Sequence, residues 1–244
     1  MQPSAYLDMA AVEERHWWFE GRRRVLSACI GRLGLKPGAR ILEVGSGTGG
    51  NLPLLRRFGS VTAVEMNEAA RDIALSCHAG ADIRGGMLPH DLPLGEQTFD
   101  LVCLFDVLEH VEDDAAALRA ARMRLAPGGV MLITVPAYKA LFGPHDEELH
   151  HKRRYERAEL EVALLAAGLR IGKLSFINAA LLPLAWALRV LDKALRRPHP
   201  TGTSVPPAPL NALFAGIFGA EGLVLPYLNL PFGLSLLALA RADD

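Results

Sequence analysis

The chain has 244 residues, enough for one domain with a sizeable buried core. Its 26 basic and 27 acidic residues leave a net charge of -1, which gives no electrostatic reason to expect a nucleic acid partner. Cys29, Cys77 and Cys103 match no zinc or redox spacing, so we expect free thiols in a reducing cytoplasm. The length favours a single domain over residues 1–244, or one domain with an insertion.

The first part of the chain alternates helix and strand patterns. Apolar residues spaced among charged ones predict a helix over 6–34, which Gly34 ends. The elements expected next are a strand over 40–45, a short helix over 51–59, a strand over 61–65, a helix over 67–80 and a weak third strand over 81–86.

The second part continues the alternation. Residues 99–108 are nearly all apolar, as is typical of a strand covered on both faces. Next we expect a helix to about Leu125, a turn at Pro127-Gly128-Gly129, a strand over 130–136, a helix over 155–168, and strands over 169–177 and 233–241. This order predicts an α/β fold with a mostly parallel sheet and helices on both faces.

A glycine-rich motif, ILEVGSGTGG, follows the first expected strand over residues 41–50. Glycines allow a tight turn close to a ligand, and the following helix offers unpaired N–H groups. Glu65 comes twenty residues after Gly45, where an acid can accept both hydroxyls of a ribose. Because Gly45, Gly47 and Gly50 also satisfy G-x-G-x-x-G, an NAD(P)-binding oxidoreductase stays an alternative.

Further motifs surround this one between residues 40 and 136: LEVGSGTG, the acid in VTAVE, LPLGEQTFDLV, DVLEHVED and LAPGGVMLITVP. Together they resemble the class I methyltransferases that depend on S-adenosylmethionine (SAM). The resemblance implies SAM as cofactor. It also implies a doubly wound, Rossmann-like sheet of seven strands, mostly parallel with an antiparallel last strand.

The resemblance assigns SAM-binding roles residue by residue. Gly45, Gly47 and Gly49 should line the methionine part, within the motif that also contains Glu43 and Ser46. On the nucleoside side, Glu65 should bind the ribose hydroxyls and Met66 should pack on the adenine. The remaining cofactor contacts are expected from Phe105, Asp106, Val107 and His110.

One position departs from the family pattern. The family usually has an Asp at the end of the third strand, where it binds the adenine amino group. This chain has Gly85-Gly86-Met87 there, so we expect backbone groups near Gly86 and Met87 to hold the adenine.

The N-terminal segment HWWFEGRRRVL, residues 16–26, resembles a subfamily in which an N-terminal helix closes over SAM. We therefore expect a helical cap over 1–39, with Arg22 paired to the cofactor's carboxylate. The alternative is an amphipathic helix in which Trp17 and Trp18 are packing anchors and the arginines are solvated.

Asp106, Glu109 and His110 reproduce the acid-x-x-Glu-His pattern with which ubiquinone-type O-methyltransferases bind a divalent ion. Similar runs occur in metal-free relatives, in which the His lies near the cofactor. We predict no metal and keep this site as an alternative.

The candidate catalytic residues lie in residues 136–155, which leave the fifth strand at the edge where open parallel sheets bind ligands. His145 and His151 are candidate general bases, and Asp146 is predicted to orient one of them. The alternative is a polar loop in which Asp146 only pairs with Arg153 or Arg154.

An apolar insertion is expected over 178–232. Its first segment has about ten apolar residues before Arg189, too few to span a bilayer, and Glu221 and Pro226 argue against a spanning helix in the second. We predict a helical lid over the active-site mouth, whose apolar surface holds a hydrophobic substrate, rests on a membrane interface or forms a homodimer contact. The alternative is additional core.

The sequence therefore predicts transfer of a methyl group from SAM to a hydroxyl or carboxyl of an apolar or lipid-linked small molecule. Besides the oxidoreductase, a non-catalytic SAM-binding partner subunit stays an alternative. Residues 1–24 lack the pattern of a secretory signal, so a cytoplasmic location is expected, with membrane association left open.

Overall fold

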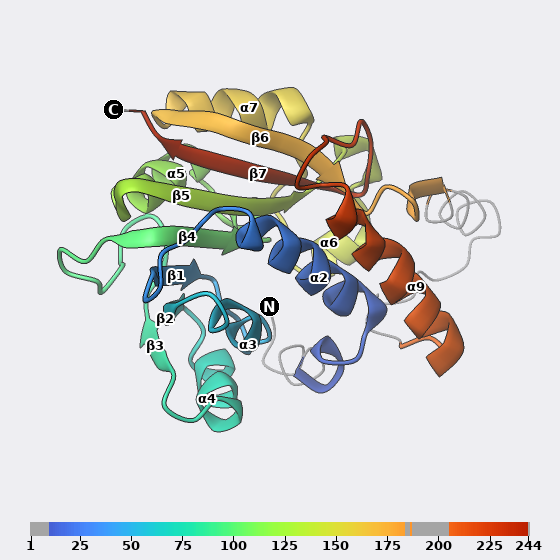
Figure 1. Ribbon diagram of the computed structural model, residues 1–244, viewed down its shortest axis with the longest axis horizontal. Coiled ribbons are helices and arrows are strands. Elements are labelled where there is room, and N and C mark those ends of the chain that lie inside the picture. The colour runs from blue at the N-terminus through green and yellow to red at the C-terminus, as the bar shows by residue number, and fades with distance from the viewer. Residues whose placement is uncertain (1–9, 184–185, 187–204, 244) are drawn as a thin grey trace.

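The computed structural model describes residues 10–183, 186 and 205–243. Its centre is one seven-stranded sheet with the order β3-β2-β1-β4-β5-β7-β6 (Figure 1). The strands are β1 (Arg40–Val44), β2 (Ser60–Glu65), β3 (Asp82–Gly85), β4 (Phe99–Phe105), β5 (Leu125–Pro136), β6 (Leu169–Ile177) and β7 (Ser235–Ala242).

The strand directions confirm the predicted fold. β1 pairs in parallel with β2 and β4, and the parallel pairing continues from β2 to β3 and from β4 to β5. β7 lies between β5 and β6 and is antiparallel to both. This is the doubly wound, Rossmann-like sheet with an antiparallel last strand.

Helices cover both faces of the sheet. The elements are α2 (Trp17–Gly31), α3 (Leu52–Leu55), α4 (Glu68–Cys77), η1 (Leu108–His110), α5 (Asp114–Arg122), η2 (Lys139–Leu141), α6 (Pro144–Glu148), α7 (Arg157–Ala166), α9 (Ala208–Ala220) and η3 (Glu221–Leu223). Side chains of α2, α3 and α9 share one buried cluster with Ile41, whereas α5 and α7 share another with Leu42. Successive residues of β1 thus point to opposite, fully covered faces.

The N-terminal helix differs from its prediction. The predicted helix ran over 6–34, but α2 begins only at Trp17, and residues 10–13 form a separate helical turn. His16 caps α2 by accepting a hydrogen bond from the Trp18 amide, and this cap separates the two segments.

β5 also starts earlier than predicted. A turn was expected at Pro127-Gly128-Gly129, but these residues lie inside β5. The register jumps from Phe99 opposite Leu125 to Leu101 opposite Val130, so the extra residues form a bulge rather than a turn.

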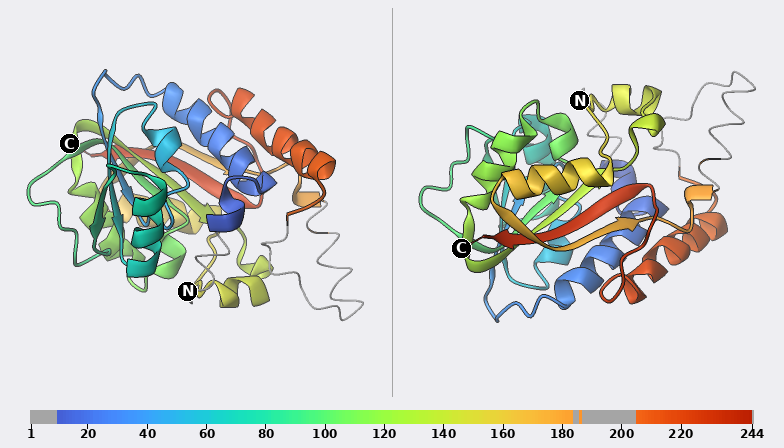
Figure 2. Two further views of the ribbon diagram at one scale, coloured as in Figure 1. Left: turned by 90° about the horizontal axis from the view of Figure 1, so that it is seen from below. Right: turned by 90° about the horizontal axis from the view of Figure 1, so that it is seen from above.

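The second half of the predicted insertion forms α9, which packs along α2 (Figure 2). A Cβ on Gly21 of α2 would lie 2.6 Å from the Phe218 ring, and the rings of Trp17 and Phe214 are 5.6 Å apart. Phe218 is fully buried, so this part of the insertion contributes to the core. Most of the first segment of the predicted insertion lies outside the described residues.

Candidate active site

The loop after β1 has a shape that requires glycine. Gly45, Gly47 and Gly49 all have φ between 55° and 90°, the left-handed region that other residues rarely adopt. A Cβ on Gly45 would lie 2.5 Å from Cγ2 of Val107, which follows β4. The loop therefore lies directly against the end of β4, where further cofactor contacts were predicted.

Glu65, the last residue of β2, joins the two halves of the predicted cofactor site. Its carboxylate accepts hydrogen bonds from the amides of Gly47, at 2.9 Å, and Asn67, at 2.8 Å. The side chain is only 5% exposed. One carboxylate thus fixes the glycine loop and the start of α4, and a carboxylate has acceptor sites left for a ligand.

Glu43 is fully buried in β1, and its Oε1 accepts a hydrogen bond from Asn51 Nδ2 at 2.8 Å. Burial raises the pKa of Glu43 to about 7, although the bond from Asn51 opposes the shift. Among the described residues, the other oxygen of Glu43 and the buried Oγ of Ser46 have no hydrogen-bond partner. Buried polar atoms without partners are rare, so these atoms fit the recognition of a polar ligand beside the glycine loop.

Arg22 of α2 reaches the end of β4. Its guanidinium forms an ion pair with Asp106 and lies over the Trp18 ring, 4.4 Å from the centroid. Asp106 follows the buried Phe105 and has a φ of 56°, a conformation that few residues other than glycine adopt. The N-terminal helix therefore meets the cofactor edge of the sheet at Asp106, and pairing of Arg22 with the cofactor's carboxylate stays a prediction.

The predicted adenine end is more open. The Met66 and Met87 side chains are 66% and 44% exposed. The Met87 amide donates to Asp91 O at 2.6 Å, and the Gly86 amide approaches Glu65 O at 3.4 Å. These two amides are thus used within the protein, and recognition of the adenine by backbone groups near Gly86 and Met87 stays a prediction. Exposed thioether side chains are what remains for packing against a base.

The polar segment after β5 folds into a hydrogen-bonded cluster around Asp146 of α6, which is 1% exposed. Its Oδ1 lies 2.9 Å from His151 Nδ1 and accepts a bond from Arg154 Nε at 2.8 Å. Burial alone would raise the pKa of Asp146, but the bonds from His151 and Arg154 outweigh it and lower the pKa to about 2. Asp146 is therefore ionised at neutral pH.

Both sequence interpretations of Asp146 describe contacts that are present. It bonds His151, as expected for a residue that orients a base, and it pairs with Arg154, as in the alternative. Arg153 instead pairs with Asp114 at 3.2 Å. His145 differs from His151 because its buried Nδ1 has no partner within the described part of the chain.

The Asp146 cluster contacts the DVLEHVED segment, which follows β4, through two imidazole rings. The rings of His110 and His151 are 4.7 Å apart and nearly perpendicular. Burial, with some help from His151, lowers the pKa of His110 to about 4. Glu109 is fully buried, and neither of its carboxylate oxygens has a partner among the described residues. Burial, reinforced by Asp106, raises its pKa well above the usual range.

Glu109, His110 and His151 are also the residues that could hold a metal ion. Their potential ligand atoms all lie within 4.8 Å of one another. The alternative considered from sequence used Asp106 instead of His151, but Asp106 is paired with Arg22. His151 was missed as a ligand because it is far from the acid-x-x-Glu-His run in sequence.

Three further residues support the site, and sequence reasoning missed two of them, Asn51 and Glu13. Asn51 supports Glu43, and Arg154 was one of two adjacent candidates for Asp146. Glu13 is the third: a Cβ on Gly50 would lie 2.5 Å from its Oε2, so the segment before α2 contacts the glycine loop. Such contacts join distant segments and leave no periodic pattern.

A family model described as a methyltransferase domain matches residues 18–174. The chain belongs to this methyltransferase-domain family. It is 31% identical over 166 residues to an S-adenosylmethionine-dependent methyltransferase of Mycolicibacterium smegmatis, a match that covers 65% of this chain and 61% of that protein. It is 32% identical over 138 residues to a ubiquinone biosynthesis O-methyltransferase of Xanthomonas campestris, with 51% and 57% covered. The matched stretch thus spans about three fifths of these relatives.

Another relative matches over more of its length. The ubiquinone biosynthesis O-methyltransferase of Xanthomonas euvesicatoria is 31% identical over 192 residues, which cover 68% of this chain and 80% of that protein.

Solved structures share the fold. A methyltransferase in complex with the Haloferax volcanii Trm112 activator superimposes with a TM-score of 0.62 at 20% identity, covering 99% of this chain and 94% of that chain. A methyltransferase of Bacillus halodurans gives 0.58 at 18% identity, with 88% and 99% covered. The cyclase SpnF also gives 0.58, at 21% identity, so these likenesses establish the fold and not the reaction.

The chain therefore contains a methyltransferase domain of this family, and the relatives that it matches are named as S-adenosylmethionine-dependent or O-methyltransferases. The comparisons give the oxidoreductase alternative no support. Within the described residues, no helix has the length and apolar character needed to cross a membrane.

Proposed function

We propose that this methyltransferase acts on a hydroxyl oxygen of an apolar small molecule and that His151 removes the hydroxyl proton. The observation that carries the proposal is the hydrogen bond between His151 and the buried Asp146, formed next to His110 of the β4 motif. It supplies a base, with a carboxylate behind it, at the edge of the sheet where the cofactor motifs converge.

Methyl transfer to a hydroxyl needs a base because a neutral hydroxyl is a weak nucleophile. SAM supplies the methyl group on a sulfonium. The ionised Asp146 carboxylate can only accept a hydrogen bond, so Nδ1 of His151 carries the N–H and Nε2 carries the free lone pair. Because Asp146 stays ionised, it also stabilises the imidazolium that forms when His151 takes up the proton.

The cofactor side is served by the glycine loop, Glu43 and Glu65. In the proposal Glu65 binds the ribose hydroxyls, and Gly47 and Ser46 contact the amino acid part. The unpartnered Ser46 Oγ and Glu43 Oε2 support this assignment, since both are buried beside the loop. A group aligned by so many fixed contacts loses little further freedom when it reacts.

The groups beside His151 favour an uncharged acceptor. Burial keeps His110 neutral at pH 7, and the raised pKa of Glu109 favours its neutral acid form. A carboxylate acceptor would bring a further negative charge to a site where Arg22 and Arg154 already pair with Asp106 and Asp146, whereas a hydroxyl acceptor brings none. The hydroxyl is therefore the better of the two acceptors considered from sequence.

Two further observations support an apolar hydroxyl compound. The relatives named ubiquinone biosynthesis O-methyltransferases are oxygen methyltransferases by name. In this chain the rings of Tyr138 and Phe176 stack 5.3 Å apart beside the carboxyl end of β5, and Phe142, just before α6, is 40% exposed. Aromatic side chains at this edge suit an acceptor with an apolar body.

The test is transfer of a labelled methyl from SAM to matched pairs of alkyl-substituted phenols and benzoates. We expect methylation of the phenols and, in His151→Ala, a fall in kcat of at least about 100-fold with unchanged affinity for S-adenosylhomocysteine. His90→Ala, which changes an exposed histidine outside the cluster, serves as the control. Preferential methylation of the benzoates, or full activity of His151→Ala, would contradict the proposal.

A further inference from the structure

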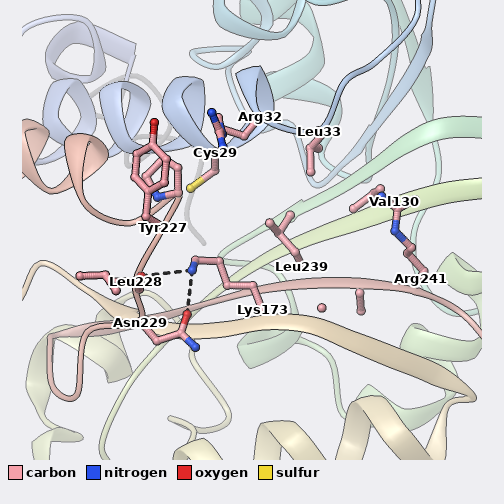
Figure 3. Close-up of a pocket in the computed structure, with 13 residues that line it drawn as sticks. Cys29, Arg32, Leu33, Val130, Lys173, Tyr227, Leu228, Asn229, Leu239 and Arg241 are labelled. Carbon is pink, nitrogen blue, oxygen red and sulfur yellow. Dashed lines mark hydrogen bonds between the residues drawn. The ribbon is translucent and has the colours of Figure 1, made fainter.

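A second hollow lies away from the methyl-transfer site. It is a groove of about 550 Å³ between the end of α2, the middle of β6, the end of β7 and residues 226–229 (Figure 3). This volume lies in the range typical of small-molecule sites.

The groove is separate from the cofactor edge. It is lined by Val130, which pairs with Leu101 near the start of the parallel β4, and by Leu239 and Arg241 near the end of the antiparallel β7. Both positions lie toward the amino ends of the parallel strands. The glycine loop, Glu65 and Asp106 all follow the carboxyl ends of their strands, so a ligand in the groove would not occupy the SAM site.

Three cations line the groove, Arg32, Lys173 and Arg241, and no acidic residue is among its described lining residues. Within residues 10–183, 186 and 205–243, none of the three forms an ion pair with a carboxylate. Arg170 lies directly opposite Arg241 in the register between β6 and β7. Like charges opposite each other are unfavourable, which favours a bound counter-ion here.

Lys173 is held where it can face a ligand. Its Nζ donates to Leu228 O at 3.1 Å and to Asn229 Oδ1 at 2.7 Å, as the dashed lines in Figure 3 show. An ammonium has three N–H groups, so one remains available. Arg32 lies over the Tyr227 ring, 4.7 Å from its centroid, an arrangement that leaves the edge of the guanidinium available for hydrogen bonds.

The remaining walls are apolar. Leu33, Val130 and Leu239 line the groove between the cations. At the rim, Tyr227 and Leu228 are 66% and 62% exposed, and nearby Leu223 is 78% exposed. A ligand that matches this surface has a charged head and an apolar body.

We propose that this groove binds a phosphate monoester with an apolar tail. Lys173 and Arg32 bind the phosphate, Arg241 adds a third positive charge, and the tail packs on Leu33, Val130 and Leu239. Three cations without an acidic partner suit the double charge of a phosphate monoester better than the single charge of a carboxylate. The site would let the enzyme recognise a phosphorylated lipid-like compound apart from its methyl acceptor.

Isothermal titration of the full chain with octyl phosphate tests the proposal, with inorganic phosphate and octanol as partial ligands. We expect one octyl phosphate site per chain, at least about tenfold tighter than either partial ligand. Lys173→Ala and Arg32→Ala should each weaken it about tenfold, since each removes a charge-assisted hydrogen bond. Arg157→Ala, which removes an exposed charge from α7 on the other face of the sheet, should bind as wild type does.

Unchanged affinity for S-adenosylhomocysteine shows that each variant is folded. Sedimentation with phosphatidylcholine vesicles, with and without phosphatidic acid, then identifies the source of the ligand. Binding to the acidic vesicles that Lys173→Ala abolishes would indicate a membrane lipid, whereas octyl phosphate binding alone would indicate a soluble metabolite. Three results would overturn the proposal. The first is equal binding of inorganic and octyl phosphate, and the second is wild-type affinity in both Lys173→Ala and Arg32→Ala. The third is adsorption to vesicles without binding of octyl phosphate.

Discussion

Arg22 of α2 and Asp106 after β4 form an ion pair that joins the N-terminal helix to the cofactor edge of the sheet. Their side chains are 8% and 22% exposed, so the pair is largely shielded from water. Arg22 was predicted to bind the cofactor's carboxylate. The Asp106 carboxylate already holds it at the edge of the sheet where the cofactor is expected.

Replacing Arg22 should weaken cofactor binding. We expect Arg22→Ala to raise the Kd for S-adenosylhomocysteine about tenfold, since a charge-assisted hydrogen bond contributes roughly 1.5–3 kcal/mol. Isothermal titration measures this directly. Arg24→Ala is the matched control because Arg24 lies on the same helix and pairs with the exposed Glu20. If both substitutions raised the Kd equally, Arg22 would contribute only to the overall positive charge of α2 and would make no specific contact with the cofactor.

The Asp146 cluster should contribute strongly to stability. Asp146→Asn leaves the buried guanidinium of Arg154 without its charged partner, and breaking a buried pair in this way costs about 3–5 kcal/mol. Urea unfolding at pH 7 tests this, with Asp82→Asn as the control. Asp82 pairs with Arg84 at the surface, so its loss should cost no more than about 1 kcal/mol. A small effect at Asp146 would mean that Arg154 is solvated in solution.

Glu43 should make stability depend on pH. Its pKa is about 7 in the folded protein against an ordinary 4.5, so the folded state binds the proton more tightly. Stability should therefore fall as the pH rises from about 4.5 to 7, by about 3 kcal/mol in total. Glu43→Gln has no proton to lose, so its unfolding free energy should exceed that of wild type at pH 8 and approach it at pH 5. Parallel profiles for the two proteins would show that Glu43 is not the group that titrates.

The contact between α2 and α9 can be tested with two glycines. Gly21→Ala places a Cβ 2.6 Å from the Phe218 ring, and overpacking of this kind costs roughly 1–3 kcal/mol. Gly216→Ala in α9 meets nothing within 4 Å and should stabilise by roughly 0.5–1 kcal/mol because helical glycine is unfavourable. Thermal unfolding of the two variants should shift in opposite directions. A Gly21→Ala protein as stable as wild type would show that α9 packs elsewhere.

The cofactor edge was predictable because its residues are close in sequence or at the ends of neighbouring strands. The glycine loop and Glu65 lie in one β-α-β unit, and the register of parallel strands brings them together. Most of the sheet was predictable because strands such as β1 and β4 are short apolar runs with clear breaks, whereas β3 carries only a weak pattern. The Pro127-Gly128-Gly129 bulge was mistaken for a turn because the same residue types favour both.

Long-range contacts were not predictable in this way. Arg22 and Asp106 are 84 residues apart, and no spacing rule links them. Two adjacent arginines follow His151, and only the folded chain shows that Arg154 contacts Asp146 whereas Arg153 turns to Asp114. At the adenine end, the amide of Met87 bonds Asp91 O, a contact that depends on the return of the chain after β3.

The central claim is that the loop after β1 and the Glu65 carboxylate bind SAM together. Isothermal titration with S-adenosylhomocysteine tests it most directly, on wild type, Glu65→Ala and the exposed neighbour variant Glu68→Ala. The structure predicts one site in wild type and in Glu68→Ala, and a loss of about 100-fold in Glu65→Ala, since two ribose hydroxyls would lose a charged acceptor. Wild-type affinity in Glu65→Ala would contradict the account.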